Sequence, residues 1–221
     1  YDTAYVEQPS NNLSLIITTS DYNGSEISCF NSNDGNIYAN VSGGTGSISY
    51  LWSNMSTNSS LTNQIAGTYS ITITDSVGCS LTDSVLLNQP NPITTINNIT
   101  HVSCNGFFDG SAEVVINGGT TDYILSWDTL SYPLIGGLNI FTTPIGVPAG
   151  VYPFRITDIN GCEYLDTISI TQPNPITSSA NISDYNGYNV SCNGYNDGNV
   201  TLNLNGGSGS LIANWGIHNP L

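Results

Sequence analysis

Apolar and polar residues alternate along much of the chain with a period of two. In residues 69–74, Tyr69, Ile71 and Ile73 alternate with serine and threonine, and residues 85–87, 114–116 and 200–204 repeat the pattern. This period is typical of a strand with one buried face. Asp-Gly and Gly-Gly pairs separate these runs, where hairpin turns need positive φ. No stretch has helical spacing, so the pattern predicts an all-β chain.

The same markers recur in the same order. A Gln-Pro pair ends at Pro9, Pro90 and Pro173, with steps of 90−9 = 81 and 173−90 = 83 residues. Within each period a Cys-x4-Asp-Gly motif, a Gly-Gly pair, a tryptophan and a Gly-Cys pair follow one another. The first cysteine lies 23 residues before the tryptophan each time (52−29, 127−104, 215−192). The chain is therefore built of tandem repeats.

The markers predict the domain boundaries. Residues 1–9 end one repeat, residues 10–90 and 91–173 are whole repeats, and residues 174–221 are the first half of a further one. About seven short strands in about 82 residues indicate an immunoglobulin-like β-sandwich. Short proline-bearing linkers should be stiff, so we expect an elongated rod and a chain that is part of a longer protein. The second repeat carries an insertion, and its apolar loop at residues 131–141 is expected to pack against a neighbouring repeat or a partner chain.

Composition excludes several function classes. The net charge is −15 and Arg155 is the only cationic residue besides histidine. The chain therefore cannot neutralise the phosphates of a nucleic acid or bind an anionic membrane surface. No apolar run approaches the roughly 20 residues of a membrane-spanning helix. The histidines, His101 and His218, occupy unrelated repeat positions and no Gly-x-Ser-x-Gly motif is present, so we expect no enzyme and no required cofactor.

Five cysteines follow the repeat. Each whole repeat holds a first cysteine, before Asp-Gly, and a second in the Gly-Cys pair. We therefore predict the disulfides Cys29–Cys79 and Cys104–Cys162, with Cys192 paired to a residue beyond Leu221. A bridge that closes about 50 residues is worth on the order of 4 kcal/mol and implies an oxidising compartment. Buried free thiols and metal ligands are the alternatives. Zinc is poorly supported, because no Cys-x2-Cys motif or nearby histidine completes its four ligands.

The turns and the aromatic residues offer further candidates. Asp34, Asp109 and Asp197 lie in turns rich in asparagine and glycine, so they are candidate calcium ligands, but hairpin-turn chemistry explains them as well. Three tryptophans share one repeat position and are expected in the core near a disulfide, with a ligand platform as the alternative. The surface candidates for stacking on a carbohydrate are Tyr22, Tyr185 and Tyr195.

The combined motif resembles the SprB repeat of gliding-motility adhesins from Bacteroidetes. The resemblance rests on the run from Val190 to Gly198, then Gly-Gly, Trp, the alternating strand, Gly-Cys and Gln-Pro. It departs from the family at Phe30, where Asn-Gly is more usual. It implies a very long, type IX-secreted filament, attached to the outer membrane and moved along the cell surface by the gliding machinery. Its partners would be neighbouring repeats, the gliding and secretion machinery and, through other regions, external surfaces or polysaccharides.

The resemblance also points to modification sites. Asp-[Ser/Thr]-apolar triplets resemble the O-glycosylation signal of Bacteroidetes and mark Thr3, Ser76, Ser84, Thr129 and Thr167; solvent-facing hydroxyls without a glycan are the alternative. The function we predict is a disulfide-stapled spacer in an extracellular adhesin filament used in gliding and attachment. The alternative is a carbohydrate-binding sandwich module that itself contacts polysaccharide.

Overall fold

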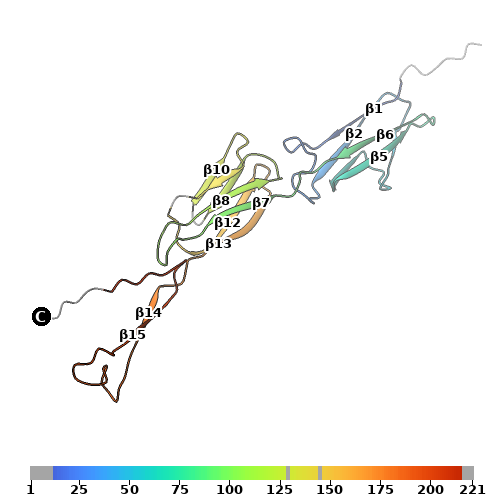
Figure 1. The fold of residues 1–221 in the computed structure, drawn as a ribbon. Helices are drawn as coiled ribbons and strands as arrows, with labels where there is room; N and C mark the ends of the chain where they lie inside the picture. The colour runs from blue at the N-terminus through green and yellow to red at the C-terminus, as the bar shows by residue number, and fades with distance from the viewer. Residues whose placement is uncertain (1–11, 128–129, 144–145, 216–221) are drawn as a thin grey trace, which may run out of the picture. The chain divides into compact units, whose positions relative to one another are not determined.

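The computed structural model describes residues 12–127, 130–143 and 146–215 (Figure 1). Its contacts divide the chain into two compact units. The first contains the residues up to Ile96, Val115–Ile140 and Arg155–Leu165, and the second contains Asn97–Val114, Phe141–Phe154 and Asp166–Leu221. The predicted boundaries at residues 10, 91 and 174 are not tested by this division and stay a prediction.

The first repeat forms two three-stranded sheets. One sheet has the order β1-β2-β4 and the other the order β3-β5-β6, with antiparallel pairing throughout. The strands are β1 (Ser14–Thr19), β2 (Gly35–Ser42), β3 (Ser49–Trp52), β4 (Ser60–Gln64), β5 (Gly67–Thr74) and β6 (Ser80–Leu87). The expected number was about seven, and residues 12–90, the described part of this repeat, form six.

Alternation along these strands fills one core between the two sheets. Ile37 on β2 and Ile71 and Ile73 on β5 are completely buried, and Trp52 at the end of β3 is 1% exposed. The indole Nε1 of Trp52 donates to the carbonyl oxygen of Asn58 at 2.8 Å, which satisfies its polar group. The predicted core position of the tryptophan is therefore confirmed in this repeat.

The second repeat adds a four-stranded sheet of order β10-β9-β12-β13 and a three-stranded sheet of order β11-β8-β7. Five of its strands, β7, β8, β11, β12 and β13, pass from one compact unit into the other. The strands are β7 (Thr94–Thr100), β8 (Ser111–Asn117), β9 (Tyr123–Trp127), β10 (Leu130–Leu134), β11 (Ile140–Thr142), β12 (Gly150–Asp158) and β13 (Glu163–Ile170).

Part of the insertion in the second repeat forms a strand that joins a sheet of the same repeat. Residues 130–134 are β10, which pairs antiparallel with β9, and the side chain of Leu134 is buried. Pro133 is tolerated there because β10 is an edge strand. The expectation that this apolar segment is a loop was therefore wrong for residues 131–134, and its packing against a neighbouring repeat or a partner chain stays a prediction.

The last described segment is a hairpin in the second unit, made of β14 (Thr177–Ile182) and β15 (Val200–Asn205). Trp127 is 6% exposed, as predicted, but Trp215 is 66% exposed. The core prediction fails for Trp215 because, within the described residues after 173, only these two strands are present to cover it.

The described residues are all-β, and the predicted fold class is confirmed as sandwich-like antiparallel sheets. No segment among them is a helix that is long and apolar enough to cross a membrane. The elongated rod remains a prediction.

Removing buried surface from the first core should destabilise it. We expect Ile37→Ala to cost about 2–5 kcal/mol of unfolding free energy, because the residue is completely buried and the cavity left behind collapses only partly. Ile16→Ala on the neighbouring strand β1, where the side chain is 63% exposed, should change it by less than about 0.5 kcal/mol. Urea titrations of both variants, followed by circular dichroism, measure the difference; equal losses would contradict the core assignment.

Candidate functional site

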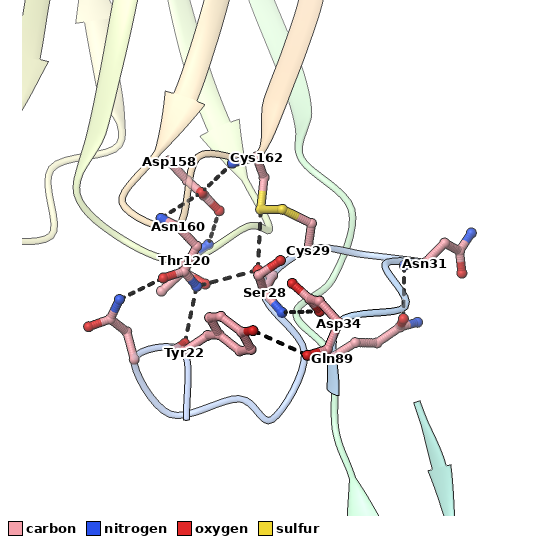
Figure 2. The surroundings of a disulfide bond; sticks show 11 residues. Tyr22, Ser28, Cys29, Asn31, Asp34, Gln89, Thr120, Asp158, Asn160 and Cys162 are labelled. Carbon is pink, nitrogen blue, oxygen red and sulfur yellow. Dashed lines mark hydrogen bonds between the residues drawn. A yellow bond between two sulfur atoms is a disulfide. The ribbon is translucent and has the colours of Figure 1, made fainter. Parts of the chain in front are cut away.

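A disulfide connects the two whole repeats. Figure 2 shows the bond between Cys29, in the loop between β1 and β2, and Cys162, just before β13. Their Cα atoms lie 5.6 Å apart although the residues are 133 positions apart in sequence. The predicted pairs Cys29–Cys79 and Cys104–Cys162 are therefore wrong, and the covalent connection lies between repeats rather than within one.

The length of β6 explains why Cys29 does not reach Cys79. The Cys29 loop is held at the C-terminal end of β6, where the N–H of Ile27 donates to the carbonyl oxygen of Asn88 at 3.1 Å. Cys79 immediately precedes β6 and so lies at its other end. Eight residues at about 3.3 Å each separate the two ends by roughly 25 Å, whereas bridged Cα atoms lie within about 7 Å. In the second repeat, Cys162 likewise immediately precedes its strand, β13.

Asp158 presents Cys162 to its partner. Its Oδ1 accepts the N–H groups of Asn160 and Cys162, both at 2.9 Å, and its Oδ2 accepts the N–H of Thr120 at 2.8 Å. Gly161 completes this tight turn with φ of 85°, a conformation that favours glycine. The carboxylate thus fixes the Gly-Cys turn, residues 158–162, to the neighbouring Gly-Gly loop.

Two other side chains hold the loop that carries Cys29. The Oδ1 of Asp34 accepts the N–H of Ser28 at 3.2 Å, and the Oε1 of Gln89 accepts the N–H of Asn31 at 2.9 Å. Gln89 belongs to the recurring Gln-Pro pair, whose role the sequence did not reveal. The loop is therefore anchored on both sides of the cysteine.

Asn160 connects the Gly-Cys turn of the second repeat to the first repeat. Its Nδ2 donates to the carbonyl oxygens of Tyr22 and Ser28 at 3.1 and 3.3 Å, and its Oδ1 accepts from the Asn23 amide at 2.6 Å (Figure 2). The Sγ of Cys162 lies 3.2 Å from the same Ser28 oxygen. Asn160 gives no repeat signal in the sequence, because the first repeat has Val77 at this position.

The Gln-Pro linker packs against the Gly-Gly pair. The N–H of Gly119 donates to the carbonyl oxygen of Asn91 at 2.8 Å. A Cβ on Gly118, where φ is 74°, would overlap the carbonyl oxygen of Pro92, so both the conformation and the close approach require glycine. A groove of about 450 Å³ lies here, lined among others by Cys29, Phe30, the linker prolines and Cys162. We call the region formed by Cys29, Asn160, Cys162 and the linker residues 90–93 the junction.

The remaining cysteines, Cys79, Cys104 and Cys192, are free and exposed. No group of three or more His, Cys, Asp or Glu side chains that could hold a metal ion is found among the described residues. The calcium candidates instead accept backbone N–H groups: Asp109 Oδ1 accepts from Ser103 and Asp197 Oδ1 from Ser191, both at 3.0 Å, as Asp34 does from Ser28. The hydroxyl and N–H of Ser103 hold the pKa of Asp109 below its ordinary value, and those of Ser191 do the same for Asp197. This geometry favours the turn interpretation, and calcium stays untested.

The glycosylation candidates fall in different places. Ser84 on β6 and Thr167 on β13 are exposed at the same position of equivalent strands, and Ser76 is exposed but donates to the carbonyl oxygen of Thr45 at 2.7 Å. Thr3 and Thr129 lie outside the described residues. Their modification remains a prediction.

The tyrosine candidates are not equivalent. Tyr22 is partly buried at the junction, where its hydroxyl donates to the carbonyl oxygen of Asp34 at 3.2 Å. Tyr185 makes the equivalent bond to Asp197 at 3.3 Å and is 40% exposed, and Tyr195 is 61% exposed. Tyr22 is therefore a junction residue and not an open stacking surface.

The disulfide can be tested with the chain's single Met and single Arg. After alkylation of free thiols under denaturing conditions, cyanogen bromide cuts after Met55 and trypsin after Arg155. The Cys29–Cys162 bond should leave residues 1–55 and 156–221 linked and release residues 56–155 without reduction. Pairing inside each repeat would instead keep all three fragments together on a non-reducing gel.

The carboxylate of the Gly-Cys turn should contribute to acid stability. Burial opposes ionisation of Asp75, but the N–H groups of Thr45, Cys79 and Val77 together hold its pKa below the ordinary value. A depressed pKa stabilises the fold above pH about 4, and this contribution is lost as the pH falls through the folded-state value.

We therefore expect Asp75→Asn to unfold at a lower temperature at pH 7, because the new amide N–H₂ faces the N–H of Thr45. Its melting temperature should also fall less than that of the parent between about pH 4 and pH 2. Asp83→Asn, at an exposed position on β6, is the matched control and should melt like the parent at pH 7. Unchanged melting of Asp75→Asn at pH 7 would refute this role.

Comparison with known proteins gives one family match. Residues 22–57 match the family model of the SprB repeat, and a search of curated proteins found no match. The matched segment contains the Cys29 loop, the Asp-Gly motif, the Gly-Gly pair and Trp52. SprB repeats are structural, non-enzymatic repeats, and the family suggests a cell-surface, adhesin-like protein. Residues 22–57 of this chain are therefore similar to the SprB repeat, and this match confirms the resemblance drawn from the sequence.

Proposed function

We propose that this chain is a spacer segment of a long cell-surface adhesin filament that serves gliding motility and attachment. In this role the repeats project a binding region from the outer membrane and carry tension to it. Support comes from the SprB repeat at residues 22–57 and from the disulfide that ties one repeat to the next. The proposed partners in the chain itself are neighbouring repeats, and external surfaces or polysaccharides are met by other regions.

The observation that carries the proposal is the position of the disulfide in the covalent path. A load applied to the two ends of the chain reaches Cys29 along the backbone, crosses to Cys162 through the sulfur atoms and continues toward the C-terminus. Residues 30–161 form a closed covalent ring that the load does not extend. Most of the first sandwich, from β2 to β6, lies in that ring.

Only β1 of the first repeat lies outside the ring on the N-terminal side among the described strands. Tension can peel β1 from β2, with which it pairs along its whole length, but cannot unravel the remaining five strands while the bridge is intact. A spacer built in this way keeps its length under load, which is the property that an adhesin filament needs.

The geometry supports this role better than carbohydrate binding by these repeats. The one aromatic residue of the proposed stacking set in the first repeat, Tyr22, is engaged at the junction through its hydroxyl and its carbonyl oxygen. The indole of Trp52 is buried in the core. Glycans on Ser84 and Thr167 belong to the same proposal, since both side chains face solvent on equivalent strands.

The spacer role predicts a specific mechanical response. Pulled from its two ends in a single-molecule instrument, the oxidised chain should extend about 450 Å less than the reduced chain, since 133 residue steps of roughly 3.4 Å are held in the ring. Cys29→Ser should behave like the reduced chain, and Cys79→Ser, at a free cysteine, should behave like the parent.

The alternative pairing gives a different record. Bonds inside each repeat would hide two separate segments of 79−29 = 50 and 162−104 = 58 residue steps. Equal extension of the oxidised and reduced chains would show that the bridge bears no load and would overturn the proposal.

A further inference from the structure

The surroundings of Cys104 repeat those of Cys29. The N–H of Ser103 donates to Asp109, as that of Ser28 does to Asp34. The N–H two residues after each cysteine donates to the Gln of the Gln-Pro pair: Gly106 to Gln172 at 2.8 Å, and Asn31 to Gln89 at 2.9 Å. Both first cysteines are thus held in the same loop, but Cys104 is free.

The groove beside Cys104 also matches the groove beside Cys29. It measures about 420 Å³ and is lined by Cys104, Asn174, Pro175, Ile176 and Gly207 among others. The first groove, of about 450 Å³, has Cys29, Asn91, Pro92, Ile93 and Gly119 at the same repeat positions.

The wall between linker and Gly-Gly pair is also the same. The N–H of Gly207 donates to Asn174 at 2.9 Å, as that of Gly119 does to Asn91 at 2.8 Å. A Cβ on Gly206 would overlap the carbonyl oxygen of Pro175, as one on Gly118 would overlap that of Pro92.

The described residues do not include a Gly-Cys turn beside the second groove. At the first junction, the Ser28 carbonyl oxygen faces Asn160 and Cys162 of the Gly-Cys turn. At the second, the equivalent Ser103 oxygen receives the hydroxyl of Ser208 at 3.3 Å. The described part of the third repeat ends at Trp215, before the position that a Gly-Cys turn takes in the earlier repeats.

The second cysteines are likewise presented in one way. Asp75 Oδ1 accepts the N–H groups of Val77 and Cys79 at 3.1 and 2.8 Å, and its Oδ2 accepts that of Thr45. Asp158 makes the same bonds around Cys162. Cys79 is therefore placed as Cys162 is, yet it is free and exposed.

We propose that the disulfides of this repeat array run in a stagger, from the first cysteine of each repeat to the Gly-Cys cysteine of the next. Cys29–Cys162 is one such bond, Cys104 takes the Gly-Cys cysteine of a completed third repeat, and Cys79 takes the first cysteine of a preceding repeat. Each bond forms as two thiols lose two protons and two electrons to a disulfide oxidant such as oxidised glutathione, which becomes two thiols. The inference goes beyond the spacer role and holds whatever the filament does.

The stagger makes the covalent rings overlap. Cys104 lies inside the ring closed by Cys29–Cys162, so the next ring begins before the previous one ends. From Cys29 onward, every peptide bond of the array would then lie within at least one ring. A single backbone cut would not sever the chain, whereas rings confined to each repeat would leave every linker cleavable.

A completed chain tests the pairing. Residues 128–173 of this protein are fused after Trp215, the counterpart of Trp127, so that the third repeat gains a Gly-Cys cysteine, here called the appended cysteine. The protein is refolded with oxidised and reduced glutathione, its free thiols are alkylated, and its disulfide-linked peptides are mapped by mass spectrometry. The expected pairs are Cys29–Cys162 and Cys104 with the appended cysteine, while Cys79 and Cys192 are alkylated.

Each other outcome overturns the proposal. A bond between the appended cysteine and Cys192 would place disulfides inside repeats. Alkylated Cys104 in a sample that contains Cys29–Cys162 would show that a folded junction does not select this partner. Absence of the Cys29–Cys162 bond itself would remove the observed pairing from which the staggered pattern is inferred.

Two variants of the completed chain serve as controls. Cys192→Ser should retain the Cys104 bond at the same yield, because Cys192 takes no part in it. Cys104→Ser should leave the appended cysteine alkylated and should not divert it to Cys192. Loss of the Cys104 bond in Cys192→Ser would contradict the stagger.

Discussion

Carboxylates in this chain are held by backbone N–H groups, because cations are almost absent. The chain has a net charge of −15. Within the part of the chain that the structure describes, the ion pair found is that of Arg155 with Glu163, at 3.3 Å. A charge that has no counter-ion is stabilised by hydrogen bonds to its ionised form. Asp158 takes three N–H groups in this way, and Asp34 one. These bonds shape the two loops that bring Cys29 and Cys162 together, so the covalent connection between repeats depends on them.

Much of the fold follows from the sequence because it is set by local pattern. The alternation in residues 69–74 correctly places Ile71 and Ile73 in the core, and the Gly-Gly pair marks a turn with positive φ. Trp52 is buried as expected, because the strands of a whole repeat surround it. The same position at Trp215 is exposed, since burial depends on neighbouring strands and not on the residue itself.

The disulfide could not be predicted in the same way. Repeat arithmetic counts cysteines per period but does not say at which end of a strand each one lies. The eight residues of β6 place Cys79 far from Cys29, and only the packing of one repeat's loop against the next repeat's turn identifies Cys162 as the partner. Asn160 was missed for a related reason, because it contacts a different repeat and Val77 replaces it in the first. The sequence did hold one signal for the pairing. The length of the strand before each Gln-Pro pair shows that the two cysteines of a repeat lie at opposite ends of it.

The disulfide lies at the junction, where hydrogen bonds rather than buried apolar side chains hold the two repeats together. Each whole repeat has apolar side chains to bury, such as Ile37 and Ile71 in the first, and burial of each is worth about 1.5–3 kcal/mol. The junction instead consists of hydrogen bonds, such as those of Asn160 to Tyr22 and Ser28, beside an open groove. Such bonds contribute only about 0.5–1.5 kcal/mol each, so the two repeats would separate easily if these contacts alone joined them. The linker already joins the repeats in one chain, and the disulfide adds a second covalent connection that persists in an oxidising compartment. The polar contacts then need only to set its geometry.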